Sequence, residues 1–89
     1  MRPYRVSSVR VDDDYLRVVV NDVEYWLSMA KIATYSDRLL KATREQREKY
    51  EVSTTGIHWP ALDEDLSIKG LIRDAEKVVE RRQGVEEAA

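Results

Sequence analysis

Residues 56–72 read Gly-Ile-His-Trp-Pro-Ala-Leu-Asp-Glu-Asp-Leu-Ser-Ile-Lys-Gly-Leu-Ile, and they constrain the fold more than any other stretch of the chain. The run from Ile57 to Trp59 predicts a short β-strand, which Pro60 ends because proline has no N–H to donate to a sheet. Three acidic residues follow, and Ser67 is a residue type that favours a helix start. The stretch therefore predicts a strand, a turn and the beginning of a helix in close succession.

The apolar residues after Ser67 recur with a period near 3.6, which predicts a C-terminal amphipathic helix. We expect this helix to end at Gly84, because glycine is favoured just past a helix C-terminus. Residues 1–83 are then expected to form a single small domain, with 84–89 as a frayed tail. The apolar positions of the expected helix are Ile68, Leu71, Ile72, Ala75, Val78 and Val79.

The N-terminal third predicts antiparallel strands. Valines alternate partly with polar residues over 6–11, and the acidic run 12–14 then interrupts the pattern. The segments 15–20 and 23–27 are rich in β-branched and aromatic residues, and the pair Asn21-Asp22 between them suits a tight turn. This is the strongest hairpin signal in the sequence.

The middle of the chain predicts short helices separated by breaks. Ser28 can cap a turn through residue 32, and either Ser36 or Asp37 can cap a second turn through residue 40. Thr43 begins Thr-Arg-Glu-Gln, which matches a capping box with Gln46. Each of these helices is expected to be only a few residues long.

Two brief strands follow, at 50–52 and 57–59, joined by a turn at 53–56. Together these elements predict the fold class α+β: a small antiparallel sheet with short helices packed on it and a C-terminal amphipathic helix. Trp26 and Trp59 are expected to fill the core, because a domain without phenylalanine needs their bulk, and an exposed indole would instead mark an interface.

Composition excludes several classes of protein. The 89 residues contain no cysteine, so a disulfide framework, a thiolate zinc site and a cysteine nucleophile are unavailable. No apolar run approaches the roughly 20 residues of a membrane helix, and we expect a soluble, cytoplasmic protein with no membrane partner. A net charge of −2 disfavours nucleic acid as a partner, because nucleic-acid-binding domains are usually basic. A domain this small has little room for a catalytic cleft, so we expect no enzyme activity and no cofactor.

The order of four segments in this chain resembles a bacterial family. These segments are the hairpin at 15–27, the segment Leu-Leu-Lys-Ala-Thr-Arg-Glu-Gln-Arg at 39–47, the strand at 50–52 and above all residues 56–72. This family is catalogued as domain of unknown function 2442, and the resemblance runs from about Val9 to Arg73. It implies a small α+β protein with no established catalytic residues. Some family members are encoded beside small toxin-like proteins, which implies an antitoxin-like or accessory binding role.

The sequence departs from the family pattern in two places. Family members often have aromatic-Pro-Arg-Leu before the first helix, whereas this chain has Tyr-Ser-Asp-Arg-Leu at 35–39. Capping by Ser36 or Asp37 is therefore expected to replace the proline. The residues from Asp74 onward extend past the block at which many members end.

The preferred hypothesis is a non-enzymatic module that binds a partner protein. Negative charge before a helix start is favoured by about 0.3 to 1 kcal/mol through the helix dipole, which accounts for two of the three acids at 63–65. The third is available to a basic partner. Self-association through the terminal helix is also expected, so the chain has a possible homodimer interface. The expected partner-binding residues are Asp63, Glu64, Asp65, Val78 and Val79.

A DNA-binding regulator is the alternative. It would use the basic segment 38–49, with 27–33 as the first helix of a helix-turn-helix motif and the residues from 37 onward as the recognition helix. The segment lacks the usual glycine in the turn, and the domain is acidic. The candidate nucleic-acid-binding residues are Arg38, Lys41, Arg44 and Arg47.

A third hypothesis gives His58 an acid–base or metal-binding role with Asp63 and Asp65. A metal site needs three or four converging ligands, and a lone histidine at a strand end is more often hydrogen-bonded for structure. We therefore expect no metal site and no catalytic residue.

Overall fold

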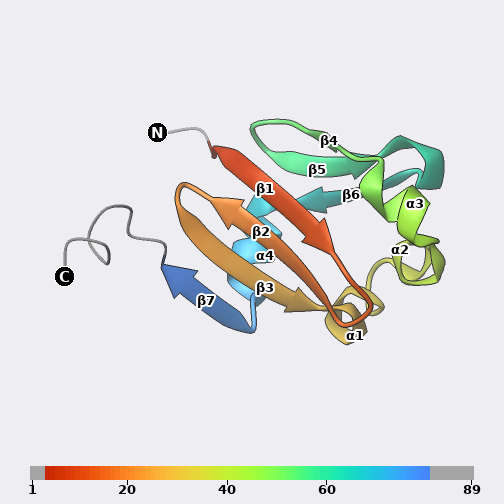
Figure 1. Cartoon of the computed structure of the whole chain (residues 1–89), viewed down its shortest axis with the longest axis horizontal. Helices are drawn as coiled ribbons and strands as arrows, with labels where there is room; N and C mark the ends of the chain where they lie inside the picture. Colours follow the sequence, from red (N-terminus) through yellow and green to blue (C-terminus); the bar gives the residue numbers. More distant parts are fainter. Residues whose placement is uncertain (1–3, 81–89) are drawn as a thin grey trace.

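The computed structural model describes residues 4–80; the expected tail at 84–89 and its Gly84 boundary lie outside them. The fold is α+β, as predicted, with antiparallel strands and several short helices (Figure 1). The elements in chain order are β1 (Val6–Val11), β2 (Tyr15–Val20), β3 (Val23–Ser28), α1 (Met29–Ile32), α2 (Asp37–Lys41), α3 (Arg44–Glu48), β4 (Glu51–Val52), β5 (Gly56–Trp59), the 3-10 turn η1 (Pro60–Leu62), β6 (Glu64–Ser67), α4 (Ile68–Asp74) and β7 (Lys77–Glu80).

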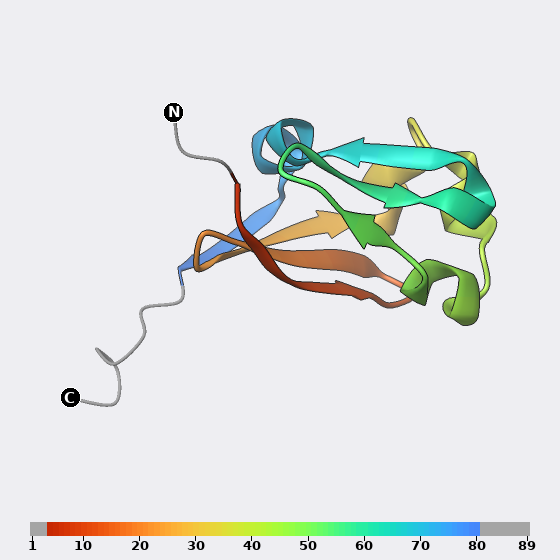
Figure 2. The same cartoon turned by 90° about the horizontal axis from the view of Figure 1, so that it is seen from above.

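The strands form two antiparallel sheets that are stacked in two layers (Figure 2). One sheet has the order β1-β2-β3-β7, and the other has the order β4-β5-β6. α4 lies in the same layer as the smaller sheet, and the short helices α1, α2 and α3 gather at one end of the molecule (Figures 1 and 2). The sequence predicted one small sheet. Its pattern did not indicate β7, which completes the large sheet, or β6, which completes the small one.

The core lies between the two layers. Leu16, Val18 and Val20 alternate along β2 and point to one face of the large sheet, as the period of a strand requires. They meet Ile57 and Trp59 of β5 from the opposite layer in one cluster of buried side chains. The other buried members of this cluster are Val9, Leu27, Met29, Ile32, Leu39, Leu66, Ile68 and Leu71.

The β2–β3 hairpin forms as predicted. Asn21 and Asp22 both have positive φ, at 49° and 68°, which matches a two-residue turn whose twist suits a hairpin. The N–H of Arg5 donates to Oδ1 of Asn21 at 2.8 Å, and the N–H of Asn21 donates to the carbonyl oxygen of Arg5 at 2.9 Å. The turn therefore also holds the segment that enters β1.

The predicted helix starts are confirmed. Oγ of Ser28 accepts the N–H of Lys31, and Thr43 and Gln46 form the complete capping box. Between the two candidates for α2, the structure selects Ser36, whose Oγ accepts the N–H of Leu39 at 3.4 Å. A serine cap therefore starts α2.

The length predicted for the C-terminal helix is wrong. α4 ends at Asp74, and the chain turns after Ala75 into β7, which pairs with β3. The physical reason is the open edge of β3: the N–H of Glu76 donates to the carbonyl oxygen of Trp26 at 2.8 Å, and two adjacent valines favour an extended chain. Val78 and Val79 therefore lie on a strand and not on a helix face.

The turn expected at 63–65 is also wrong in part. Only Asp63 has a turn conformation, with φ at 52°. Glu64 and Asp65 belong to β6, where they lie opposite Trp59 and His58. Pairing with β5 prevails over the low strand propensity of acidic residues.

Candidate functional site

The outer edge of β7 is the most exposed apolar element in the described structure. β7 is the last strand of the large sheet, and no described strand pairs with its outer side (Figure 1). Val78 and Val79 are 56% and 39% exposed, and they point to opposite faces because side chains alternate along a strand. Such an edge presents backbone N–H and C=O groups that can pair with another extended chain.

Glu76 holds β7 in place. Besides its backbone bond to Trp26, its Oε1 accepts the N–H of Ser28 at 2.6 Å. Hydrogen bonds from the Ser28 side chain and backbone lower the pKa of the Glu76 carboxyl, so the group is ionised at neutral pH. The contacts of Glu76, which lies just before β7 and close to the end of α4, therefore position the strand edge.

Trp26 lies on the outer face of the large sheet and not in the core, which corrects the expectation for this residue. Its ring is sandwiched by cations: the Arg17 guanidinium carbon lies 5.0 Å and the Lys77 Nζ 4.6 Å from the ring centroid. Tyr15 packs edge-on against the indole, with 5.3 Å between the two ring centroids. Trp59 is buried as expected, and its Nε1 donates to the carbonyl oxygen of Arg47 at 2.9 Å.

The acidic segment 63–65 forms an exposed corner at the start of β6. Oδ2 of Asp63 lies 3.8 Å from Nη1 of Arg38, a distance typical of a weak surface ion pair. The first turn of α4 contains no acidic residue, and its cap is the Ser67 hydroxyl, which accepts the N–H of Gly70 at 3.1 Å. The expectation that two of these acids stabilise the helix start through its dipole is therefore wrong.

The structure does not bring the five expected partner-binding residues together. Glu64 and Asp65 lie in the small sheet, and Asp63 is the turn residue between η1 and β6. Val78 and Val79 lie in the large sheet, at the opposite end of the molecule (Figures 1 and 2). The two groups form separate surfaces, and the β7 edge is the one with apolar side chains to cover.

His58 makes a local pair with a carboxylate. It lies between Glu51 of β4 and Asp65 of β6 in the sheet register, and its Nδ1 lies 2.5 Å from Oδ1 of Asp65. Within residues 4–80, no group of three or more metal-ligating side chains could hold an ion. This arrangement supports a structural contact across two strands.

The basic segment 38–49 does not form a helix-turn-helix motif. α1 has four residues and α2 has five, which is too short for a helix that spans a major groove. Arg38 donates to the carbonyl oxygen of Leu62 at 3.3 Å, and Lys41 pairs with Asp37 at 2.9 Å. Both cations remain exposed, but their local partners lie within or beside the same small helices.

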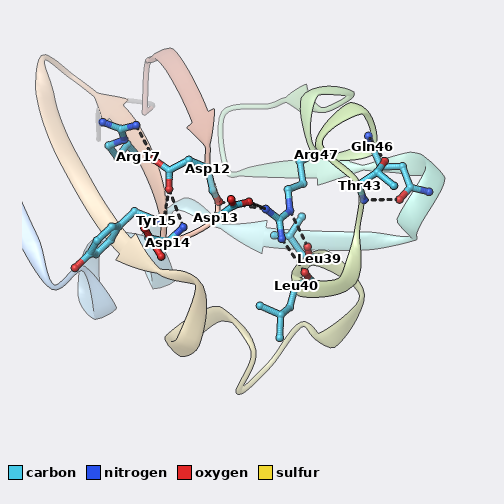
Figure 3. A network of polar contacts seen from close by, with 10 residues as sticks. All are labelled: Asp12, Asp13, Asp14, Tyr15, Arg17, Leu39, Leu40, Thr43, Gln46 and Arg47. Carbon is cyan, nitrogen blue, oxygen red and sulfur yellow. Dashed lines mark hydrogen bonds and ion pairs between the residues drawn. The ribbon is translucent and has the colours of Figure 1, made fainter.

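Arg47 is buried, which corrects its assignment to a nucleic-acid surface. Only 8% of the residue is exposed, and all three of its guanidinium nitrogens donate to carbonyl oxygens (Figure 3). Nε donates to the backbone carbonyl oxygen of Leu39 at 3.3 Å, Nη2 to that of Leu40 at 2.7 Å, and Nη1 to that of Asp12 at 3.2 Å. The side chain thus ties the end of α2 to the turn after β1, and its burial withdraws it from a nucleic-acid surface.

Asp12 organises that turn. Its Oδ1 accepts the N–H groups of Asp14 and Tyr15, both at 2.8 Å, and its Oδ2 accepts Nη2 of Arg17 at 2.7 Å (Figure 3). These bonds, first that from the Tyr15 backbone, lower the pKa of the Asp12 carboxyl. The acidic run at 12–14 is therefore a structural turn with one fully bonded carboxylate.

The sequence interpretation missed the cationic sandwich of Trp26. A two-residue turn at 21–22 fixes the hairpin register, so the position of Arg17 opposite Trp26 follows from the sequence. The position of Lys77 does not, because β7 was predicted to be helical. The structure places Arg10, Arg17, Trp26 and Lys77 in one row across the four strands of the large sheet.

Comparison with known proteins identifies a family. The model of the family described as "Protein of unknown function (DUF2442)" matches residues 6–77. No curated protein and no solved structure is significantly similar to the chain. None of the helices between residues 4 and 80 has the length and apolar character needed to cross a membrane.

Proposed function

This chain belongs to the DUF2442 family of proteins of unknown function, and from that premise we propose that it is a non-enzymatic module that binds a partner protein through the edge of β7. The observation that carries the proposal is the outer edge of β7, where Val78 and Val79 are exposed. The family assignment supplies no activity, so the proposal rests on this surface.

The mechanism is addition of a strand. An extended segment of the partner pairs with the backbone of β7, and its side chains cover the two valines. Covering an exposed valine contributes at most about 1.5 kcal/mol, so the main-chain hydrogen bonds and the fit of neighbouring side chains must supply the rest. The acidic corner at 63–65 is a second surface, which attracts a basic partner over a distance and increases the rate of encounter.

The cellular role that we propose is antitoxin-like or accessory binding in a bacterial cytoplasm. The partner would be the product of a neighbouring gene, and binding would occlude a surface that this product needs for its own action. This part of the proposal rests on the family resemblance. The geometry contributes the edge on which such a partner can be held.

The experiment is co-expression of the chain with the product of the neighbouring gene, followed by size-exclusion chromatography with light scattering. Val78→Lys adds a charge to the edge, a device that natural sheets use against strand pairing. Val52→Lys is the matched control, because Val52 is 44% exposed on β4 of the other sheet. We expect Val78→Lys to weaken the complex at least about tenfold and Val52→Lys to leave it unchanged.

Three results would count against the proposal. The first is the absence of a complex at micromolar concentration, and the second is equal weakening by both variants. The third is binding to duplex DNA that falls steeply with salt, which would favour the DNA-binding regulator, because phosphate contacts release counterions. A dimer of the chain alone that Val78→Lys dissociates would identify a second copy as the protein that pairs with β7.

A further inference from the structure

A cavity of about 280 Å³ lies beside β1, at the edge of the large sheet opposite to β7. Its lining residues come from β1, β2, α3 and the segments next to them, so its walls are built from parts far apart in the sequence. Four arginines and two carboxylates line it, which leaves a surplus of two positive charges. These charged residues are Arg10, Arg17, Arg44, Arg47, Asp12 and Glu48.

The arginines differ in what their guanidinium groups already bind. All three nitrogens of Arg47 donate to carbonyl oxygens, so this residue forms part of the wall. The side chains of Arg10 and Arg44 make no hydrogen bond or ion pair with another residue among 4–80. Two exposed cations whose side chains have no partner in the described part of the chain therefore line one concave site.

Arg17 is held in place and is still short of one acceptor. Its Nη2 donates to Asp12, and its guanidinium packs on the ring of Trp26. Its Nε is buried and has no hydrogen-bond partner in the described structure. An unpaired buried donor costs free energy, and an oxyanion within reach of it would supply the missing acceptor.

The carboxylates do not cancel this positive charge. Both oxygens of Asp12 are occupied by Arg17 and by the backbone N–H groups of Asp14 and Tyr15. Glu48 offsets one of the remaining cations. An anion that enters the cavity therefore meets a net positive site.

We propose that this cavity binds a phosphate group, held by Arg10, Arg17 and Arg44. Guanidinium groups present paired donors that match the oxygens of phosphate. The volume lies at the lower limit of small-molecule sites, so it accommodates a phosphate with a few waters and little more. The site lies away from the β7 edge, and the proposal stands whether or not a protein binds there.

The phosphate has two possible sources, a free ion and the phosphodiester of a single-stranded nucleic acid. A strand could continue from the cavity along the row of Arg10, Arg17, Trp26 and Lys77 on the open face of the sheet. A row of cations can hold the phosphates of a single strand without reading its sequence. The two sources share the same contact inside the cavity.

The test is isothermal titration of the full chain at low ionic strength, first with inorganic phosphate and then with a single-stranded DNA of about ten nucleotides. Arg44→Gln removes one ligand, and Arg38→Gln is the matched control, since Arg38 is an exposed arginine that lies outside the cavity. We expect Arg44→Gln to weaken phosphate binding about tenfold and Arg38→Gln to weaken it less than about twofold. Thermal unfolding checks that both variants fold, and Arg10→Gln replaces Arg44→Gln if the latter is destabilised.

The outcomes separate the two sources. Phosphate binding that Arg44→Gln weakens, with no tighter binding of the DNA, supports a site for a free ion. DNA binding at least about tenfold tighter than that of phosphate, again weakened by Arg44→Gln, supports a phosphodiester. The proposal is overturned if neither ligand binds more strongly than chloride at the same ionic strength, or if the two variants lose affinity equally.

Discussion

Replacement of Arg47 by methionine tests whether this residue belongs to the fold. Methionine keeps most of the aliphatic stem but removes all three guanidinium nitrogens, which leaves the carbonyl oxygens of Leu39, Leu40 and Asp12 without this partner. A hydrogen bond to a charged group contributes about 1.5 to 3 kcal/mol. The sum is an upper bound, because water can reach the two carbonyl groups that are only partly buried. We expect a loss of about 3 kcal/mol in the free energy of unfolding.

This loss is large for a domain of 89 residues, since small domains unfold at a cost of about 5 to 15 kcal/mol. It corresponds to a fall in Tm of roughly 12 to 24 °C. Urea unfolding followed by circular dichroism measures it. The matched control is Arg44→Met, three residues earlier on the exposed side of α3, where we expect a change within about 0.5 kcal/mol. Equal and small effects of both variants would refute the structural role of Arg47.

Four further predictions concern β5, α4 and two turns. Gly56→Ala should destabilise the protein by about 1 to 3 kcal/mol, because the new Cβ would lie 2.9 Å from the carbonyl oxygen of Leu66. Gly70→Ala should be neutral or stabilising by up to about 1 kcal/mol, since its Cβ meets nothing closer than 3.6 Å in a helix; urea unfolding with the opposite ranking would contradict both. The pKa of Asp12 is lowered from 3.8, so the stability that this carboxylate provides is present above its unfolded pKa and is lost as pH falls through the lower folded value. The difference in Tm between wild type and Asp12→Asn should therefore shrink from pH 7 to pH 2, and a constant difference would contradict the assignment. Asp22→Val should cost about 1 to 2 kcal/mol, because φ is 68° there, whereas Asp22→Gly should stay within about 0.5 kcal/mol; equal stability of the two variants would argue against the turn.

The parts of the fold that were predicted correctly depend on short-range chemistry. The hairpin turn at Asn21 and Asp22, the serine caps and the capping box of Thr43 with Gln46 all involve residues that lie within a few positions of each other. Such signals are complete within the local sequence. The family resemblance pointed to the same fold class.

The errors have a common physical cause. Residues 75–79 carry an apolar pattern that a helix and a short strand can share, and the deciding contact is the edge of β3, about 50 residues earlier in the sequence. β6 was missed for the same reason, since it forms only because β5 offers a partner. Long-range pairing of this kind is not encoded in the spacing of side chains along one segment.

The candidate sites show the same division. Val78 and Val79 were expected to be available to a partner, and they are exposed, but on a strand edge that the sequence did not predict. Arg47 was expected on the surface, because arginine is seldom buried without partners. Its carbonyl partners come from α2 and from the turn after β1, so only the folded chain identifies them.

The most direct test of the proposed function is amide hydrogen exchange of the chain, measured alone and in complex with the product of the neighbouring gene. If the partner adds a strand to β7, the alternate amides within Lys77–Glu80 that point away from β3 gain new hydrogen bonds and should exchange at least about tenfold more slowly in the complex. The amides of β4, in the other sheet, should be unchanged. A complex in which β7 shows no added protection, while α3 or the acidic corner at 63–65 does, would contradict the proposal that the β7 edge is the binding site.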